Sequence, residues 1–145
     1  MSTLKIGICG WGNVATGLYK IAKKNTESIK KQGNLDIEIV VIGARRDNPN
    51  CKPENVIIER DIFNVVNHDI DVMVELIGGV DVAKDLILKA LKKKKHVVTA
   101  NKAVIYNHGD EIFACAKENG VKVLFESSVC AGTPIIKLLT EELSA

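Results

Sequence analysis

A glycine-rich turn near the start of the chain has the residue types and spacing of a phosphate-binding loop. Residues 10–15 read G-W-G-N-V-A, the pattern G-x-G-x-x-A, between an apolar stretch and an amphipathic one. Gly10 permits a tight turn, Gly12 lets a pyrophosphate approach the backbone, and Ala15 lets the following helix pack close to the preceding strand. The free N–H groups of that helix then face the phosphates. The turn predicts dinucleotide binding, and the alternative is a tight strand–helix turn in another α/β protein.

Two arginines follow the next apolar stretch, residues 37–42, in the sequence G-A-R-R-D. At the end of the second strand of a dinucleotide-binding domain, a carboxylate suits the ribose hydroxyls of NAD, whereas a guanidinium group suits the 2′-phosphate of NADP. Arg45 and Arg46 therefore favour NADP, with NAD as the alternative. Two other possibilities stay open: either arginine is a solvated surface group, or Asp47 reaches the ribose.

Lys102 and Glu75 are further candidates at strand ends. Lys102 follows the stretch 96–99 in T-A-N-K, so we expect its ammonium to reach the nicotinamide end of the cleft. There it would bind a polar substrate group or polarise a carbonyl. The alternative is a lysine on the first turn of a helix that Asn101 caps. Glu75 interrupts an apolar strand, where it either faces the cofactor or points to an edge.

Glu126 ends an apolar stretch and precedes a loop of small residues, 127–133. A carboxylate beside free carbonyls can hold a hard cation through oxygen ligands. The residues alone favour the other interpretation, in which Glu126 caps the next backbone N–H groups. Neither the histidines nor the cysteines have the spacing of a metal or redox motif: these are His68, His96 and His108, and Cys9, Cys51, Cys115 and Cys130.

Strands and helices alternate along the chain, and this alternation predicts an α/β fold with a doubly wound parallel sheet (a Rossmann-type dinucleotide-binding domain) and right-handed crossovers. Ligands of such a sheet gather beyond the carboxyl ends of its strands, where the candidate residues lie. Strands are expected over residues 4–9, 37–42, 72–77, 96–99 and 121–125, and helices over 13–31, 61–67, 82–94, 110–118 and 134–143. In the first helix, an apolar face is expected from Val14, Leu18, Ile21, Ala22 and Ile29.

The composition is that of one globular domain. The chain has 145 residues, of which 46% are hydrophobic and 26% charged. A net charge of +2 and 4% aromatic residues give no indication of nucleic-acid binding. No apolar run approaches the roughly 20 residues that cross a bilayer, and no signal peptide precedes the first strand. We therefore expect a cytoplasmic protein with reduced cysteines and with neither a nucleic-acid nor a membrane partner.

Three later segments resemble the N-terminal nucleotide-binding domain of homoserine dehydrogenases. They read V-E-L-I-G-G at 74–79, H-V-V-T-A-N-K at 96–102 and F-E-S-S-V-C-A-G-T-P-I-I at 125–136, in the family's order and spacing. The glycine turn departs mildly from the family's more usual G-x-G-x-x-G. The resemblance covers nearly the whole chain. It implies NAD(P)-dependent interconversion of L-homoserine and L-aspartate 4-semialdehyde, on the route to threonine, methionine and isoleucine.

The resemblance also implies roles for individual residues. The turn would hold the pyrophosphate, Arg45 would meet the 2′-phosphate, and Ile77 and Gly78 would line the nicotinamide half. Lys102 would match the family's lysine near cofactor and substrate. The turn residues are Gly10, Trp11, Gly12, Asn13 and Val14. The position of Trp11 in the turn, apart from any resemblance, predicts a residue that packs over the cofactor cleft. A monovalent-cation site, usually sodium, would correspond to Glu126, Val129, Ala131 and Thr133.

The family's substrate domain, with its acid–base lysine and partner aspartate, lies further downstream than residue 145. We therefore expect residues 1–145 to be the NAD(P)-binding domain, the substrate domain to be absent, and the chain alone to turn over little homoserine. The family's dimer contacts, expected in a homodimeric full-length protein, are also largely in the missing part. Two alternatives remain: a non-catalytic NAD(P)-binding sensor module, or a dehydrogenase of another small aldehyde or amino acid.

Overall fold

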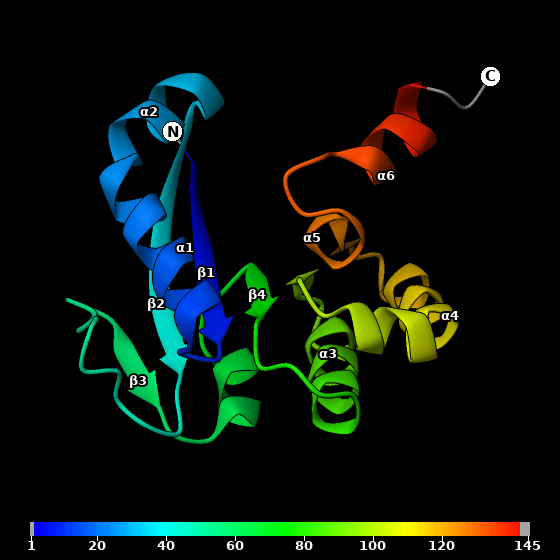
Figure 1. Cartoon of the computed structure of the whole chain (residues 1–145), viewed down its shortest axis with the longest axis horizontal. Helices are drawn as coiled ribbons and strands as arrows, with labels where there is room; N and C mark the ends of the chain where they lie inside the picture. Colours follow the sequence, from blue (N-terminus) through cyan, green and yellow to red (C-terminus); the bar gives the residue numbers. More distant parts are fainter. Residues whose placement is uncertain (1, 143–145) are drawn as a thin grey trace.

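A parallel β-sheet forms the centre of the computed structural model, which describes residues 2–142 (Figure 1). Its six strands lie in the order β3-β2-β1-β4-β5-β6, and every neighbouring pair is parallel. The order reverses direction between β1 and β4, which makes that point the switch point of a doubly wound sheet. The predicted fold class is therefore confirmed. The strands are β1 (Ser2–Cys9), β2 (Leu35–Gly43), β3 (Ile57–Glu59), β4 (Val72–Glu75), β5 (His96–Thr99) and β6 (Val123–Leu124).

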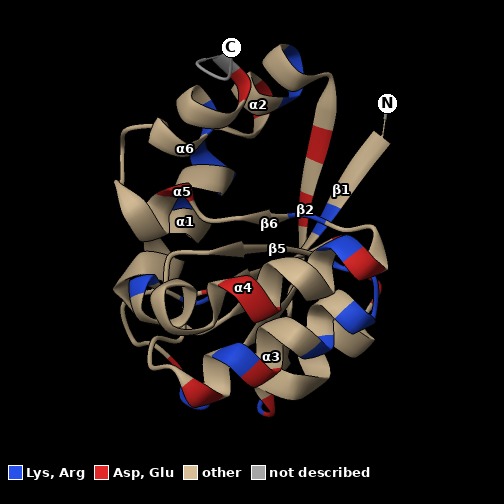
Figure 2. Ribbon diagram, turned by 90° about the vertical axis from the view of Figure 1, so that its right-hand side faces the viewer, with Lys and Arg blue, Asp and Glu red and all other residues tan. Residues whose placement is uncertain are grey.

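Helices cover both faces of the sheet. Helices α1 (Asn13–Lys24) and α2 (Thr26–Gly33) connect β1 to β2, and α3 (Asp81–Lys92) connects β4 to β5. These crossovers run in opposite directions along the sheet, so right-handed connections place them on opposite faces. Figure 2 shows α3 and α4 on one side of β5 and β6, with α1 and α2 on the other. The remaining helical elements are the 3-10 helix η1 (Ile62–Asn67), α4 (Lys102–Asn119), α5 (Glu126–Val129), α6 (Ile135–Lys137) and the π-helix η2 (Leu138–Glu142).

The core consists of two buried layers, one on each face of the sheet. Because successive strand residues point to opposite faces, Ile8 and Ile42 belong to one layer and Cys9 and Val41 to the other. The first layer packs against α1 and the second against η1, α3 and α4. Helix α3 contributes fully buried side chains to the second layer: Leu86, Ile87, Ala90 and Leu91.

The long helix expected over residues 13–31 is two helices. The amide of Asn25 donates to the carbonyl of Ile21, and the Thr26 hydroxyl donates to the carbonyl of Ala22, so both side chains satisfy the preceding turn. Side chains of this type compete with the helical backbone and favour helix ends. The structure therefore ends α1 at Lys24 and begins α2 at Thr26.

The expected apolar face of this segment is largely not buried. Val14 is 64% exposed and Ile21 is 61% exposed, while Ala15 and Tyr19 of α1 are the buried apolar residues. Leu18, Ile21, Ala22 and Ile29 instead line an open apolar groove of about 580 Å³ over strands β1, β2, β4 and β5. The helical periodicity identified the apolar residues of α1 correctly. The side of α1 that faces the core, however, is the side of Ala15, which lies close to the sheet.

Other boundaries also differ from the expectations. Helix α4 begins at Lys102 rather than at residue 110, with non-helical backbone at His108. Strand β3 was not expected, β4 stops at Glu75, and β6 has only two residues. One turn of helix, α5, lies in the expected loop 127–133, and two short elements replace the expected helix over 134–143, whose last residue lies outside the described part. Across residues 2–142, no helix combines the length and the apolar character needed to cross a membrane.

Candidate dinucleotide-binding site

The two glycines of the turn are required for different reasons. Gly10 has a φ of +105°, and a Cβ there would lie 2.6 Å from the carbonyl oxygen of Leu76, so only glycine fits. Gly12 has a φ of −88°, and a Cβ there would have no heavy atom within 4 Å. Nothing in the described protein therefore requires glycine at 12, whereas an approaching phosphate does.

The N-terminus of α1 is open to a ligand. Asn13 and Val14 are exposed, and no side chain of the described chain caps this terminus. Its first turn contains no acidic residue, so the free N–H groups and the dipole present a positive end. Ala15 is 1% exposed, as expected for the small residue that lets α1 approach the sheet.

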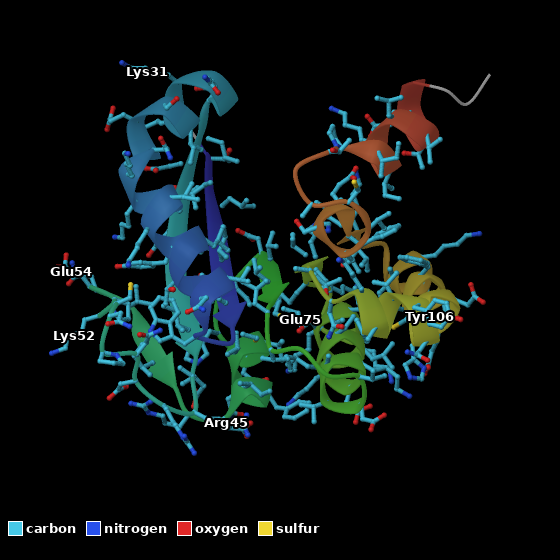
Figure 3. All side chains as sticks on the ribbon, in the orientation of Figure 1. Lys31, Arg45, Lys52, Glu54, Glu75 and Tyr106 are labelled. Atoms are coloured by element: carbon cyan, nitrogen blue, oxygen red, sulfur yellow. The ribbon has the colours of Figure 1, made fainter. Side chains whose placement is uncertain are left out.

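Arg45 and Arg46 lie at the carboxyl end of β2 and are both exposed (Figure 3, where Arg45 is labelled). Neither arginine forms an ion pair with another described residue. Asp47 does form one: its Oδ1 lies 2.7 Å from Nη2 of Arg60, whose Nη1 also donates to the carbonyl of Ala44. The carboxylate that could compete for a ribose is thus paired with Arg60, while the two guanidinium groups have no partner among residues 2–142.

Trp11 fixes the loop after β2 beside the glycine turn. Its indole Nε1 donates to the carbonyl of Cys51 at 3.2 Å, and its ring meets Tyr19 edge-on at 5.5 Å. The amide of Asn48 donates to the carbonyl of Trp11. A pocket of about 160 Å³ lies between Trp11, Ala44 and this loop.

A second pocket, of about 540 Å³, lies on the other side of the switch point. It brings together residues from three strand ends that the sequence singled out: Val14 after β1, Ile77 and Gly78 after β4, and Lys102 after β5. Lys102 is exposed and is the first residue of α4. Asn101 caps that helix, because its Oδ1 accepts from the N–H of Val104 at 3.2 Å. From the sequence, Lys102 was either a residue of the cleft or a residue on the first turn of a helix capped by Asn101. In the structure it is both.

Glu75 lines the same pocket, yet its side chain is fully buried. Its Oε1 accepts from the N–H of Ile77 at 2.9 Å and of Gly78 at 3.3 Å, and its Oε2 accepts from the hydroxyl of Thr99 at 2.5 Å. Burial, together with the negative charge of Glu75, raises the pKa of Cys9 to about 12. The Cys9 thiol is therefore neutral at ordinary pH and is not a nucleophile. The sequence signal for Glu75 was a lone carboxylate at the end of an apolar strand.

Glu126 accepts main-chain hydrogen bonds from α6 rather than from the N–H groups directly after it. Its carboxylate accepts from the N–H of Ile136 at 3.1 Å and of Lys137 at 2.6 Å. The carbonyl of Thr133, one of the expected cation ligands, accepts from the N–H of Ile135. Val129 and Ala131 are exposed. Each carboxylate oxygen of Glu126 thus accepts one main-chain hydrogen bond in this structure. Among the described residues, no group of three or more His, Cys, Asp and Glu side chains could hold a metal.

The sheet order, the glycine turn at its switch point and the adjoining pocket define a dinucleotide-binding α/β domain. The family model described as "Homoserine dehydrogenase, NAD binding domain" matches residues 10–126. The chain belongs to this family.

Relatives and solved structures agree with this assignment. The homoserine dehydrogenase of Pseudomonas aeruginosa is 50% identical over 146 residues, which cover 100% of this chain and 34% of the relative. That of Bacillus subtilis is 34% identical, again over 100% of this chain and 34% of the relative. The crystal structure of a homoserine dehydrogenase from Thiobacillus denitrificans superposes with a TM-score of 0.88 at 38% identity, over 96% of this chain and 33% of the other.

A hyperthermophilic archaeal homoserine dehydrogenase in complex with NADPH superposes with a TM-score of 0.76 at 26% identity, over 94% of this chain and 48% of that one. The chain spans about a third of the length of the curated relatives described above. What it shares with them is therefore the cofactor domain.

Proposed function

We propose that this chain binds NADP(H) and that it is the cofactor domain of an enzyme that interconverts L-homoserine and L-aspartate 4-semialdehyde. The main support is the pocket at the switch point, where Val14, Gly78 and Lys102 meet in a chain of the homoserine dehydrogenase family. The open space beside Gly12 and the uncapped start of α1 fit a pyrophosphate.

NADP is favoured over NAD by the charges at the end of β2. Arg45 and Arg46 are exposed and unpaired among the described residues, so a 2′-phosphate would gain charge-assisted hydrogen bonds there. The ion pair with Arg60 competes with a ribose diol for the Asp47 carboxylate. An exposed ion pair is weak, so we expect a preference for NADP rather than strict exclusion of NAD.

In the proposed reaction, a dinucleotide held at this site would supply or accept the hydride. Lys102, at the mouth of the pocket, would place an ammonium near the substrate carbonyl oxygen and stabilise the negative charge that develops on it during reduction. Ile77 and Gly78 would form one wall for the nicotinamide. The proton that completes the alcohol would come from a group outside this chain.

On the basis of the family resemblance, the proposal also includes the setting of the enzyme. We propose that it is cytoplasmic, that it acts on a small-molecule substrate in threonine, methionine and isoleucine biosynthesis, and that the complete protein is a homodimer. A monovalent cation, sodium, stays a prediction from the resemblance of residues 125–136. In this structure the Glu126 carboxylate accepts two main-chain hydrogen bonds from α6, which a bound cation would have to replace or share.

The test is an assay of the complete protein that contains this domain. We expect NADPH formation from L-homoserine and NADP, and a large loss of turnover in Lys102→Met, which removes the charge but keeps a long side chain. Turnover of a different aldehyde or amino acid would favour another dehydrogenase on the same fold. NADPH binding without turnover of any such compound would favour the alternative that the protein is a non-catalytic NAD(P)-binding sensor module.

A further inference from the structure

We infer that Glu75 is a positioning residue: it joins the two walls of the nicotinamide end of the cleft and thereby sets the affinity for that half of the cofactor. The inference rests on the proposed NADP(H) binding. It concerns a residue that the proposed reaction does not use directly.

Glu75 is the only charged side chain in the described chain that is fully buried. Its neighbours in β4 are Val72, Met73 and Val74, so an apolar residue would suit this strand position. Burying a carboxylate is costly unless hydrogen bonds replace its water. The Glu75 carboxylate accepts such hydrogen bonds from two neighbouring segments. After β4 the donors are the N–H groups of Ile77 and Gly78, and at the end of β5 the donor is the Thr99 hydroxyl. Figure 3 shows it in the centre of the molecule.

The first wall, residues 77–79, depends on this carboxylate for its shape. Gly78 and Gly79 have φ values of +72° and +76°, and a Cβ at either position would contact nothing within 4 Å. No side chain at 78 or 79 helps to fix the loop, and two successive glycines leave its backbone free there. Ile77 packs against the core, and the hydrogen bonds that Oε1 of Glu75 accepts from the N–H groups of Ile77 and Gly78 constrain the backbone where the glycines begin.

The second wall, residues 99–102, is joined to the same carboxylate through Thr99. The Thr99 hydroxyl donates to Glu75 and accepts from the N–H of Asn101 at 3.0 Å. The Thr99 carbonyl in turn accepts from the hydroxyl of Ser128 at 2.7 Å. The amide of Asn101 donates back to the carbonyl of Gly79 at 2.7 Å, which closes the connection between the walls. Lys102 follows directly, so its position depends on the same network.

A cleft whose walls are fixed before binding loses less entropy when the ligand enters. The network therefore serves the nicotinamide half, which lies on the β4–β5 side, and leaves the adenosine half near Arg45 unaffected. This separation distinguishes a positioning residue from one that only stabilises the fold.

The experiment titrates this chain with NADPH and with adenosine 2′,5′-bisphosphate, which has the adenosine half without the nicotinamide. Glu75→Met keeps the length of the side chain and removes both acceptors, so we expect NADPH affinity to fall roughly 10- to 100-fold. Affinity for the bisphosphate should stay within about twofold of the wild type. Glu75→Gln keeps an acceptor for the two N–H groups and should restore part of the loss.

A second pair of variants tests the network without changing Glu75. Thr99→Val should weaken NADPH selectively, and Thr99→Ser, which keeps the hydroxyl, should not. Equal losses for both ligands, or unchanged NADPH affinity in Glu75→Met and Thr99→Val, would overturn the inference. If the wild-type chain binds neither ligand, the proposed function itself fails. If the wild-type chain binds NADPH and the bisphosphate equally tightly, the nicotinamide half adds no affinity. In that case only the inference about Glu75 fails.

Discussion

At the scale of single residues, Gly10 and Gly12 differ in what they serve: Gly10 serves the fold of the turn and Gly12 serves cofactor binding. Gly12→Val places its side chain in open space at a φ of −88°, so the variant should fold and lose NADPH binding. Gly10→Ala forces a Cβ to 2.6 Å from a backbone oxygen at positive φ, so it should lower the free energy of unfolding by about 1–3 kcal/mol. Thermal unfolding and NADPH titration of both variants measure the two effects separately.

The reverse outcome would contradict this assignment. A folded Gly12→Val protein that keeps wild-type NADPH affinity would show that the pyrophosphate does not approach that backbone. A Gly10→Ala protein of wild-type stability would show that the turn relaxes without cost.

Cys9 gives a pH-dependent prediction. Its pKa is raised from 9.0 to about 12 in the folded chain by burial and by Glu75. Above pH 9 the unfolded chain loses this proton while the folded chain keeps it, so stability falls as pH rises toward 12. We expect a loss of up to about 1.4 kcal/mol per pH unit from this group. Urea unfolding between pH 8 and roughly pH 10 should show that loss, with a smaller slope in Cys9→Ala.

At the scale of elements, Asn101 joins helix α4 to the loop after β4. Its Oδ1 caps α4 and its amide donates to the carbonyl of Gly79. Asn101→Ala should therefore cost about 1–2 kcal/mol of stability through the lost cap. Asn101→Asp keeps the acceptor and should cost clearly less. Chemical denaturation compares the two, and equal losses would mean that the bond to Gly79, rather than the cap, carries the stability.

Most elements could be predicted because their signals are local. The β-branched stretch 37–42 and the G-x-G turn fixed β2 and the start of α1, and Gly120 ends α4 in the left-handed conformation. Strand β3 was missed because three residues carry too little pattern. The break at Asn25 was missed because it depends on side chains that bond to the preceding turn.

At the scale of the whole molecule, the candidate site could be predicted only in part. The rule that ligands lie at the carboxyl edge of the sheet correctly grouped Val14, Ile77, Gly78 and Lys102. The pairing of Asp47 with Arg60 and the network of Glu75 depend on contacts between elements, which no local pattern encodes. The direction in which α1 faces the sheet depends on the same kind of contact.

The charged residues of α3 and α4 are of mixed sign. Figure 2 shows Lys and Arg interspersed with Asp and Glu over α3 and α4, and the net charge is +2.

The most direct test of the account is calorimetric titration of this chain with NADPH and with NADH, in the wild type and in Arg45→Ala. We predict that the wild type binds NADPH more tightly than NADH. Arg45→Ala should lose about 1.5–3 kcal/mol of NADPH binding, because a hydrogen bond to a charged phosphate is lost, and its NADH affinity should be nearly unchanged. Equal wild-type affinities for the two dinucleotides, or equal losses for both in the variant, would contradict the proposed NADP site.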